Sequence, residues 1–409
     1  MTLFEELKWR GLIKDISSPE LEEKLNKGGM TFYIGTDPTA DSLHIGHYST
    51  FLMAKRLAKA GHHPMLLVGM ATGLVGDPRG TTEREKVDAK VIQDNYIKLK
   101  AQVEQLFQMK VVNNYDWFKE MNYIEFLREV GKYINVGYMI NKDLVKRQME
   151  SGISYAEFSY MLIQGYDFKY LHEHEGVTLQ IGGSDQWGNL TTGIELIRKT
   201  TGDEVYAFSI PLVTDSTGKK FGKSEGNAIW LDKNKTSSYK LYQYLINLED
   251  SMMENYLKLF TFLNKEEIEN IIKKHEEYPE QRIAQKELAK QIITDLHGIE
   301  EYEKASQLSD ILFKENFKQL TKEDIQDIFE EKDIVSIQKD NNNLIDLLIN
   351  IGAAKSKREA REFITGNAIK INGEKIMDLD YTVSDKDYID NTYIIIKRGK
   401  KNYYVGKKC

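Results

Sequence analysis

The chain has 409 residues, of which 41% are hydrophobic and 29% charged, and its formal net charge is −7. This length exceeds what one hydrophobic core usually holds and the composition is that of a globular chain, so we predict two or three folded domains and exclude a disordered protein. The acidic balance excludes a protein that coats nucleic acid with bulk positive charge, although it leaves room for a local basic patch.

The cysteine content and the first residues predict a reduced, cytoplasmic protein. The single cysteine, Cys409, excludes an internal disulfide and a cysteine-built zinc site. No apolar run reaches about 18 residues, so we expect no membrane span. The segment 1–10 contains Glu5 and Glu6 and lacks the basic start and apolar stretch of a signal peptide.

The first half of the chain alternates strand-like and helix-like patterns, which predicts an α/β domain at 1–226 with a parallel sheet. Short apolar runs mark the strands, and amphipathic stretches mark the helices, one of which Gly61 ends. The expected strands are 31–36, 64–69 and 177–181, and the expected helices are short ones within 2–27 and longer ones at 43–60, 86–109 and 189–199.

The second half is predicted to form two further domains. Strand patterns are absent from most of 227–331, where amphipathic, Glu/Lys-rich stretches predict an α-helical domain. The polar, Asn-rich run 332–343 predicts a linker. In 344–409 two helical patterns precede β-type runs at 368–371 and 393–397, which predicts a small α+β domain.

Charge is unevenly distributed between these parts. The segment 352–409 carries 13 Lys/Arg and 8 Asp/Glu, a net charge of +5, whereas 1–351 carries 43 and 55, a net charge of −12. The overall acidity is therefore a property of the main body, and the C-terminal end is basic enough to approach nucleic acid.

The segment from Asp37 to His47, DPTADSLHIGH, follows the first predicted strand and opens a helix. His44 and His47 share one face of the first helical turn, and Gly46 leaves room for a planar ring beside the backbone. A helix N-terminus at the carboxyl edge of a parallel sheet favours phosphate, to which two imidazoles can donate hydrogen bonds. Alone, the pair also fits a metal site or an incidental surface pair; its position favours phosphate chemistry.

A second basic segment, 219–224, reads KKFGKS and follows the last part of the predicted sheet. Lys220 and Lys223 flank a glycine in a flexible stretch and can hold a polyphosphate by charge. Taken alone, a solvated basic loop is the simpler interpretation.

Two further segments carry polar residues where an ordinary core would be apolar. Tyr160, Gln164 and Asp167 share one face of a predicted helix that also contains Met161, Leu162 and Phe168. Buried polar groups need partners, and a bound polar ligand supplies them. The segment 180–189, QIGGSDQWGN, ends a strand and offers Gln180, Asp185 and Gln186 at the edge of the sheet.

Together, the histidine and lysine segments resemble the marker motifs of the class I aminoacyl-tRNA synthetases, His44–His47 reading HIGH and 220–224 reading KFGKS, a variant of KMSKS. With Tyr33, Asp77 and the two polar segments, the chain closely resembles the bacterial tyrosyl-tRNA synthetases over nearly its whole length. The resemblance implies a Rossmann-like catalytic domain, a helical anticodon-side domain and an S4-like RNA-binding domain at 344–409. It also implies a homodimer joined through an insertion at about 115–150.

The activity implied by the resemblance is tyrosine–tRNA ligation. L-Tyrosine and ATP give tyrosyl-adenylate and pyrophosphate, and the tyrosyl group then passes to the 3′-terminal ribose of tRNA(Tyr). Mg²⁺ accompanies ATP, and no tightly bound, protein-ligated metal is expected. No editing domain is evident in the sequence, in line with a site that rejects phenylalanine by leaving a buried polar group unpaired.

The resemblance also implies roles for individual residues. For ATP and its phosphates, they are His44, His47, Thr50, Lys220, Lys223 and Ser224, with Gly46, Asp37 and Asp185 at the adenylate. For tyrosine, they are Tyr33 and Asp167 at the phenol hydroxyl, Asp77, Tyr160 and Gln164 at the ammonium group, and Gln186 near the carboxylate. For the RNA backbone, they are Lys355, Lys357, Arg358 and Arg361.

The sequence departs from the family pattern at three places, of which Ser224 in place of a threonine keeps the hydroxyl and changes little. Ile34 stands where many members carry cysteine, and Thr81 and Thr82 stand where many carry a phosphate-binding lysine, for which Arg79 or Arg84 is a candidate substitute. Three alternatives remain at this point: a small nucleotidyltransferase with a similar histidine segment, a tryptophanyl-tRNA synthetase, and a synthetase-like RNA-binding protein without catalysis.

Overall fold

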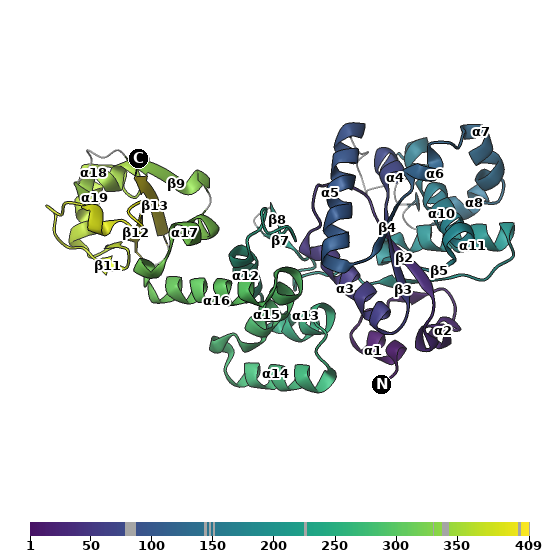
Figure 1. The fold of residues 1–409 in the computed structure, drawn as a ribbon, viewed down its shortest axis with the longest axis horizontal. Coiled ribbons are helices and arrows are strands. Elements are labelled where there is room, and N and C mark those ends of the chain that lie inside the picture. The colour runs from purple at the N-terminus through teal and green to yellow at the C-terminus, as the bar shows by residue number, and fades with distance from the viewer. Residues whose placement is uncertain are drawn as a thin grey trace. The chain divides into compact units, whose positions relative to one another are not determined.

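The computed structural model describes the chain except for residues 78–86, 143–144, 147–148, 150–151, 225–226, 330, 338–342, 400–401 and 409 (Figure 1). It divides into two compact units, one made of Met1–Lys235 and Leu248–Leu288 and the other of Thr236–Asn247 and Ala289–Cys409. This division differs from the three predicted domains, because the helices expected at 227–331 are shared between the two units.

The first unit contains a six-stranded sheet in the order β1-β6-β5-β2-β3-β4. Strands β2 to β6 are mutually parallel, as predicted, and the two-residue β1 pairs antiparallel with β6. Strands β1, β4 and β6 were not expected from the sequence. The strands are β1 (Asp15–Ile16), β2 (Thr31–Thr36), β3 (His63–Val68), β4 (Lys110–Asn113), β5 (Val177–Gly183) and β6 (Tyr206–Ile210).

Helices cover both faces of this sheet. Residues of α10 and α11 pack on the face that carries Tyr33, Met65 and Leu67. Right-handed crossovers place α3, between β2 and β3, on the opposite face. The helices of this unit are α1 (Leu3–Trp9), α2 (Leu21–Lys27), α3 (Ile45–Lys59), α4 (Met70–Val75), α5 (Ala89–Phe107), α6 (Tyr115–Phe118), α7 (Tyr123–Phe126), α8 (Val136–Ile140), α10 (Tyr155–Glu175), α11 (Trp187–Thr200), α13 (Met253–Phe260) and α14 (Lys265–Glu277).

The strand order reverses between β2 and β5, which lie side by side. From β2 the chain moves to β3 and β4 on one side, and from β5 it moves to β6 on the other. Ligands of open α/β sheets bind outside the carboxyl ends of the strands at this kind of reversal. The hairpin of β7 (Lys223–Ser224) and β8 (Asn227–Ala228) also belongs to the first unit.

The second unit contains a five-stranded sheet in the order β11-β10-β12-β13-β9 (Figure 1). Its strands are β9 (Ile334–Ile337), β10 (Ile369–Ile371), β11 (Glu374–Lys375), β12 (Tyr393–Arg398) and β13 (Asn402–Lys408). Its helices are α12 (Ser238–Ile246), α16 (Ile299–Lys314), α17 (Lys322–Ile328), α18 (Leu344–Asn350) and α19 (Lys357–Thr365), while α15 (Ile283–His297) contributes to both units.

Both faces of this second sheet are covered, because β12 is apolar on both. Its first four residues, Tyr393 to Ile396, are all buried. Ile394 and Ile396 pack with α18 and α19, whereas Tyr393 and Ile395 pack with residues of α16 and α17.

The prediction of a linker at 332–343 is wrong for part of this segment. Residues Ile334–Ile337 form β9, which pairs parallel with β13. Its residues 338–342 lie outside the described part of the chain. Among the described residues, no helix is both long and apolar enough to cross a membrane.

Candidate active site

A cavity of about 840 Å³ lies at the carboxyl end of β2 and β5, where the strand order reverses. Every predicted site residue of the first unit whose side chain is described lines this cavity. These are Tyr33, Asp37, His44, Gly46, His47, Thr50, Asp77, Tyr160, Gln164, Asp167, Asp185, Gln186 and Lys220. Of Lys223 and Ser224 only the backbone is described, in β7. Lys355, Lys357, Arg358 and Arg361 are exposed residues of the second unit.

A fully buried carboxylate, Asp167 on α10, lies in the wall of the cavity. Its two oxygens accept hydrogen bonds from the Asn114 amide at 3.2 Å and the Trp117 indole N–H at 3.0 Å. Burial raises the pKa of Asp167 well above its usual range, while these two donors oppose the shift. The carboxylate is therefore held in one orientation and each oxygen keeps capacity for a further donor.

Three buried polar atoms of the cavity wall lack a hydrogen-bond partner among the described residues. They are the Tyr33 hydroxyl, Gln164 Oε1 and Gln180 Oε1. Tyr33 and Gln180 are cross-strand neighbours on β2 and β5, with only 1% and 2% of their surface exposed. Because buried polar groups are nearly always paired in folded proteins, this wall is complementary to a polar ligand.

A second set of polar contacts orients the residues above this wall. Asp37 accepts hydrogen bonds from the Tyr160 hydroxyl at 3.2 Å and the Thr72 hydroxyl at 2.8 Å. On the other side, the Gln186 amide donates to Asp77 at 2.9 Å and its oxygen accepts from Asn189. Side chains from the segment after β2, from α10 and from the turn before α11 are thus fixed around one space.

The two histidines form the first turn of α3 as an unusual capping pair. His44 Nδ1 accepts from the Gly46 N–H at 3.1 Å, and His47 Nδ1 accepts from the His44 N–H at 3.2 Å. Because both Nδ1 atoms accept, each neutral ring carries its proton on Nε2. The rings stack with centroids 3.9 Å apart. A Cβ at Gly46 would lie 2.9 Å from the His44 ring, so the glycine is needed for this stack.

The lysine segment is held directly against the histidine turn. Ile45 N–H donates to Ile229 O at 2.8 Å, and Ile229 N–H donates to Gly222 O at 3.0 Å. Gly222 has φ of +91°, and a Cβ there would lie 2.4 Å from the Ile45 side chain. The two segments predicted to act together are therefore adjacent, although 176 positions separate His44 from Lys220 in the chain, and Lys220 lies in the cavity wall.

Comparisons with known proteins agree with this geometry. Residues 25–314 match the family model for tRNA synthetases class I (W and Y), and residues 324–405 match a tyrosine–tRNA ligase SYY-like C-terminal domain. The tyrosine–tRNA ligases of Streptococcus mutans and Streptococcus thermophilus are 46% and 47% identical to the chain, each over 99% of both sequences. A truncated mitochondrial tyrosyl-tRNA synthetase from Aspergillus nidulans has a similar structure, with a TM-score of 0.69, 33% identity and coverage of 76% of this chain and 94% of that one.

The chain belongs to the tyrosine–tRNA ligases of class I.

This membership decides between the alternatives left open by the sequence. Small nucleotidyltransferases and tryptophanyl-tRNA synthetases are excluded by the full-length similarity to tyrosine–tRNA ligases and by the matching C-terminal domain. The expectation of an enzyme is confirmed in the same way. Of the departures from the family, Ile34 lines the cavity with 2% of its surface exposed, whereas Arg79, Thr81, Thr82 and Arg84 lie outside the described residues.

Sequence reasoning missed the residues that orient Asp167 in this tyrosine–tRNA ligase. Asn114 and Trp117 lie at the end of β4 and in α6, about 50 positions before Asp167 in the chain. No local pattern marks them, because their function as donors depends on where α10 packs. Thr72, which bridges Asn114 and Asp37, was missed for the same reason.

The partly buried His47 makes an acid-dependent stability change testable. Burial, and then the neighbouring His44, lowers the pKa of His47 to about 3. The unfolded chain binds this proton near pH 6.5 while the folded chain does not, so this residue destabilises the protein as pH falls below 6.5, by up to about 1.4 kcal/mol per pH unit. His47→Asn keeps an acceptor for the His44 N–H and removes the titration, so urea midpoints at pH 7.5 and 5.0 should differ less than in the wild type. An equal difference in both proteins would contradict the assignment.

Proposed function

We propose that the cavity binds L-tyrosine with its phenol hydroxyl between Tyr33 and Asp167. The observation that carries this proposal is the buried Tyr33 hydroxyl, which has no hydrogen-bond partner in the described part of the chain and lies on a wall shared with the buried Asp167. A phenol donates to the carboxylate and accepts from Tyr33, which satisfies both groups. Phenylalanine would leave the Tyr33 hydroxyl and a lone pair of the Asp167 carboxylate unpaired, which is the physical basis for rejecting it.

The ammonium and carboxylate of the bound tyrosine are assigned to the polar groups above. Asp77, Tyr160 and Gln164 provide acceptors for the ammonium group, and the Gln164 oxygen is buried and unpartnered among the described residues. The Gln186 amide lies within hydrogen-bond distance of Asp77 and is assigned to the tyrosine carboxylate. Asp37 and Asp185 are assigned to the adenylate.

The phosphates of ATP are assigned to the histidine turn and the lysine segment. The tyrosine carboxylate attacks the α-phosphorus, the bond to the bridging oxygen breaks, and pyrophosphate leaves. The Nε2–H groups of His44 and His47 donate to the phosphate oxygens that gain charge, and Lys220, Lys223 and Ser224 hold the leaving group. The 3′-terminal ribose hydroxyl of tRNA(Tyr) then takes the tyrosyl group and AMP leaves. No covalent enzyme intermediate is required, because the residues act by position and charge.

Mg²⁺ is proposed to enter with ATP. Among the described residues, no group of three or more His, Cys, Asp or Glu side chains is arranged to hold a metal ion. Magnesium retains water and binds phosphate oxygens readily, so the nucleotide is the expected source of its ligands. When bound, it neutralises part of the phosphate charge.

Tyrosine-dependent exchange between ATP and pyrophosphate tests the proposed activity. The wild-type protein should catalyse the exchange with tyrosine and show no comparable rate with tryptophan or phenylalanine. Exchange that depends on tryptophan, or no exchange with any amino acid, would contradict the proposal.

A homodimer through the insertion 115–150 is proposed from the residues exposed there. Large apolar side chains of this segment and of the following Tyr155 are exposed, and such clustering marks association surfaces. They are Tyr115, Tyr123, Ile124, Leu127, Tyr133, Val136 and Tyr155. Sedimentation equilibrium should give twice the chain mass of 47.3 kDa, and a monomer at micromolar concentration would contradict this proposal. The cytoplasmic location stays a prediction from the sequence.

The basic start of α19 is proposed to bind the tRNA backbone in an S4-like module. Lys355, Lys357, Arg358 and Arg361 are all exposed, although Lys357 pairs with Asp346 and Arg358 with Glu362. The double substitution Lys355→Glu with Arg361→Glu should weaken tRNA binding and lower the salt slope of binding by about 2, because two phosphate contacts are lost. Pyrophosphate exchange should be unchanged.

The double substitution Lys375→Glu with Lys386→Glu is the matched control for this prediction, since it reverses two exposed charges of the same unit outside α19. Filter binding of tRNA at several salt concentrations measures both effects. Equal losses in the two proteins would show a general charge effect and contradict a specific contact.

A further inference from the structure

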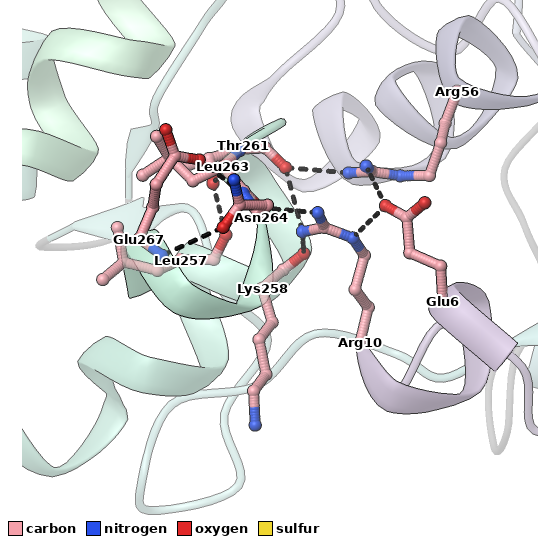
Figure 2. A network of polar contacts seen from close by, with 9 residues as sticks. All are labelled: Glu6, Arg10, Arg56, Leu257, Lys258, Thr261, Leu263, Asn264 and Glu267. Carbon is pink, nitrogen blue, oxygen red and sulfur yellow. Dashed lines mark hydrogen bonds and ion pairs between the residues drawn. The ribbon is translucent and has the colours of Figure 1, made fainter. Parts of the chain in front are cut away.

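A cluster of charged groups, made of two buried arginines and the partly exposed Glu6, joins three helices of the first unit away from the cavity (Figure 2). Arg10, which follows α1, and Arg56 of α3 both contact one Glu6 carboxylate oxygen, at 2.7 and 3.0 Å. The two arginine side chains are only 2% and 5% exposed. Burial, and then the neighbouring charge of Arg10, lowers the pKa of Arg56 to about 10, which leaves it charged at neutral pH.

Other N–H groups of the two arginines bind the C-terminal end of α13, whereas the buried Arg56 Nε has no hydrogen-bond partner among the described residues. Arg10 donates to the carbonyl oxygens of Lys258, Thr261 and Leu263 at 2.9, 3.2 and 2.6 Å, and Arg56 donates to that of Thr261 at 2.8 Å. Carbonyls at a helix end have no partner within the helix and carry partial negative charge. Figure 2 shows the two planar guanidinium groups directed at this turn.

The start of the next helix, α14, is capped separately, so the contacts of Arg10 serve the end of α13. Asn264 and Glu267 form a capping box at the start of α14, and the Thr261 hydroxyl binds Leu257 O. The arginines therefore fix the end of α13 and the connection that follows it. A planar fork that reaches three carbonyls cannot be replaced by the single ammonium group of lysine.

The helix held in this way, α13, packs against the lysine segment of the cavity. The Phe221 ring lies 4.7 Å from the Tyr256 ring and 4.9 Å from the Phe260 ring, both on α13. The Tyr256 hydroxyl also donates to Thr214 O, and Thr214 bridges to Lys220.

Phe260 is shared with the histidine helix as well. The Tyr48 ring stacks on the Phe260 ring with centroids 6.1 Å apart. Tyr48 directly follows His47 in α3. One residue at the end of α13 thus contacts both segments that line the phosphate end of the cavity.

We propose that Arg10 is a positioning residue for the reaction, which it supports by fixing the end of α13 and, through Phe260 and Tyr256, the Lys220–Ser224 segment relative to the histidine turn. The proposal rests on the proposed function of these two segments. It assigns no contact between Arg10 and the substrates. A displacement of about 1 Å at reacting groups can cost 10²-fold in rate, so a distant change at Arg10 has a measurable consequence.

Arg10→Lys is the test, with adenylate formation measured under saturating ATP and tyrosine. The rate constant should fall by about 10- to 100-fold, while the KM for tyrosine stays within about twofold, since Tyr33 and Asp167 lie on other elements. Arg56→Lys, which removes one contact to Thr261, should have a smaller effect of the same kind. Leu25→Ala, a buried change on α2, serves as a control matched for thermal stability and should leave the rate constant within about twofold.

A double-mutant cycle with Phe221→Ala separates positioning from general destabilisation. If Arg10 acts through the aromatic contacts of Phe221, Arg10→Lys should add little to the loss already caused by Phe221→Ala. Fully additive losses, or an unchanged rate constant in folded Arg10→Lys, would overturn the proposal. Absence of tyrosine-dependent exchange in the wild type would instead overturn the proposed function, so the two failures are distinguishable.

Discussion

Asp167→Ala is expected to remove most of the selectivity for tyrosine over phenylalanine. The wild-type carboxylate is buried, held by Asn114 and Trp117, and left with an unpaired lone pair when phenylalanine binds. Tyrosyl-tRNA synthetases discriminate against phenylalanine by about 10⁵-fold without editing. We expect the ratio of kcat/KM values for the two amino acids to fall by roughly 10²- to 10³-fold, because Tyr33 retains part of the recognition.

The measurement is pyrophosphate exchange with each amino acid in turn. The selectivity should fall because kcat/KM for tyrosine decreases, while kcat/KM for phenylalanine stays similar or rises. Asp167→Asn preserves the shape of the side chain and separates loss of charge from loss of packing. A variant that still rejects phenylalanine as strongly as the wild type would rule out recognition of the hydroxyl by Asp167.

His44→Ala and Lys220→Ala are each expected to lower the rate of adenylate formation by about 10²- to 10³-fold, the usual cost of one donor to a developing charge. Tyrosine affinity should remain nearly intact, because neither residue lies on the wall that holds the phenol. Both substitutions should lower the rate constant of adenylate formation, because the contacts of His44 and Lys220 with the phosphates strengthen as the phosphate gains charge.

The neighbouring Lys219 provides a matched control for the lysine. It is exposed and does not line the cavity, so Lys219→Ala should leave adenylate formation within about twofold. Single-turnover kinetics give the rate constant, and equilibrium dialysis gives tyrosine affinity. Unchanged exchange in both His44→Ala and Lys220→Ala would refute the assignment of the phosphate site.

The elements that bracket the site were predictable from local pattern. The expected strand 31–36 coincides with β2, and the helix expected at 43–60 is α3, Ile45–Lys59. Strand β6 was missed because Tyr206–Ile210 includes alanine and serine, which are weak strand formers. Strand β9 was missed because four residues, Ile334–Ile337, lie between strongly polar stretches.

The site itself was predictable where one short segment carries several functional groups. The spacing of His44 and His47, and the polar face of Tyr160, Gln164 and Asp167, are visible in one helical turn or two. Contacts such as Arg10 with Thr261, 251 positions apart, depend on packing between distant helices and leave no local pattern. Sequence reasoning thus identified the groups placed in the cavity and missed those that hold them there.

The two-sided burial of β12 has a consequence for how the C-terminal region melts. Its sheet cannot separate from α16 and α17 without exposing the buried Leu308, Phe317 and Ile325. Loss of the sheet and loss of these helices are therefore expected in a single calorimetric transition. A chain truncated within 332–343 would keep the helices and present their apolar side to solvent, which favours aggregation.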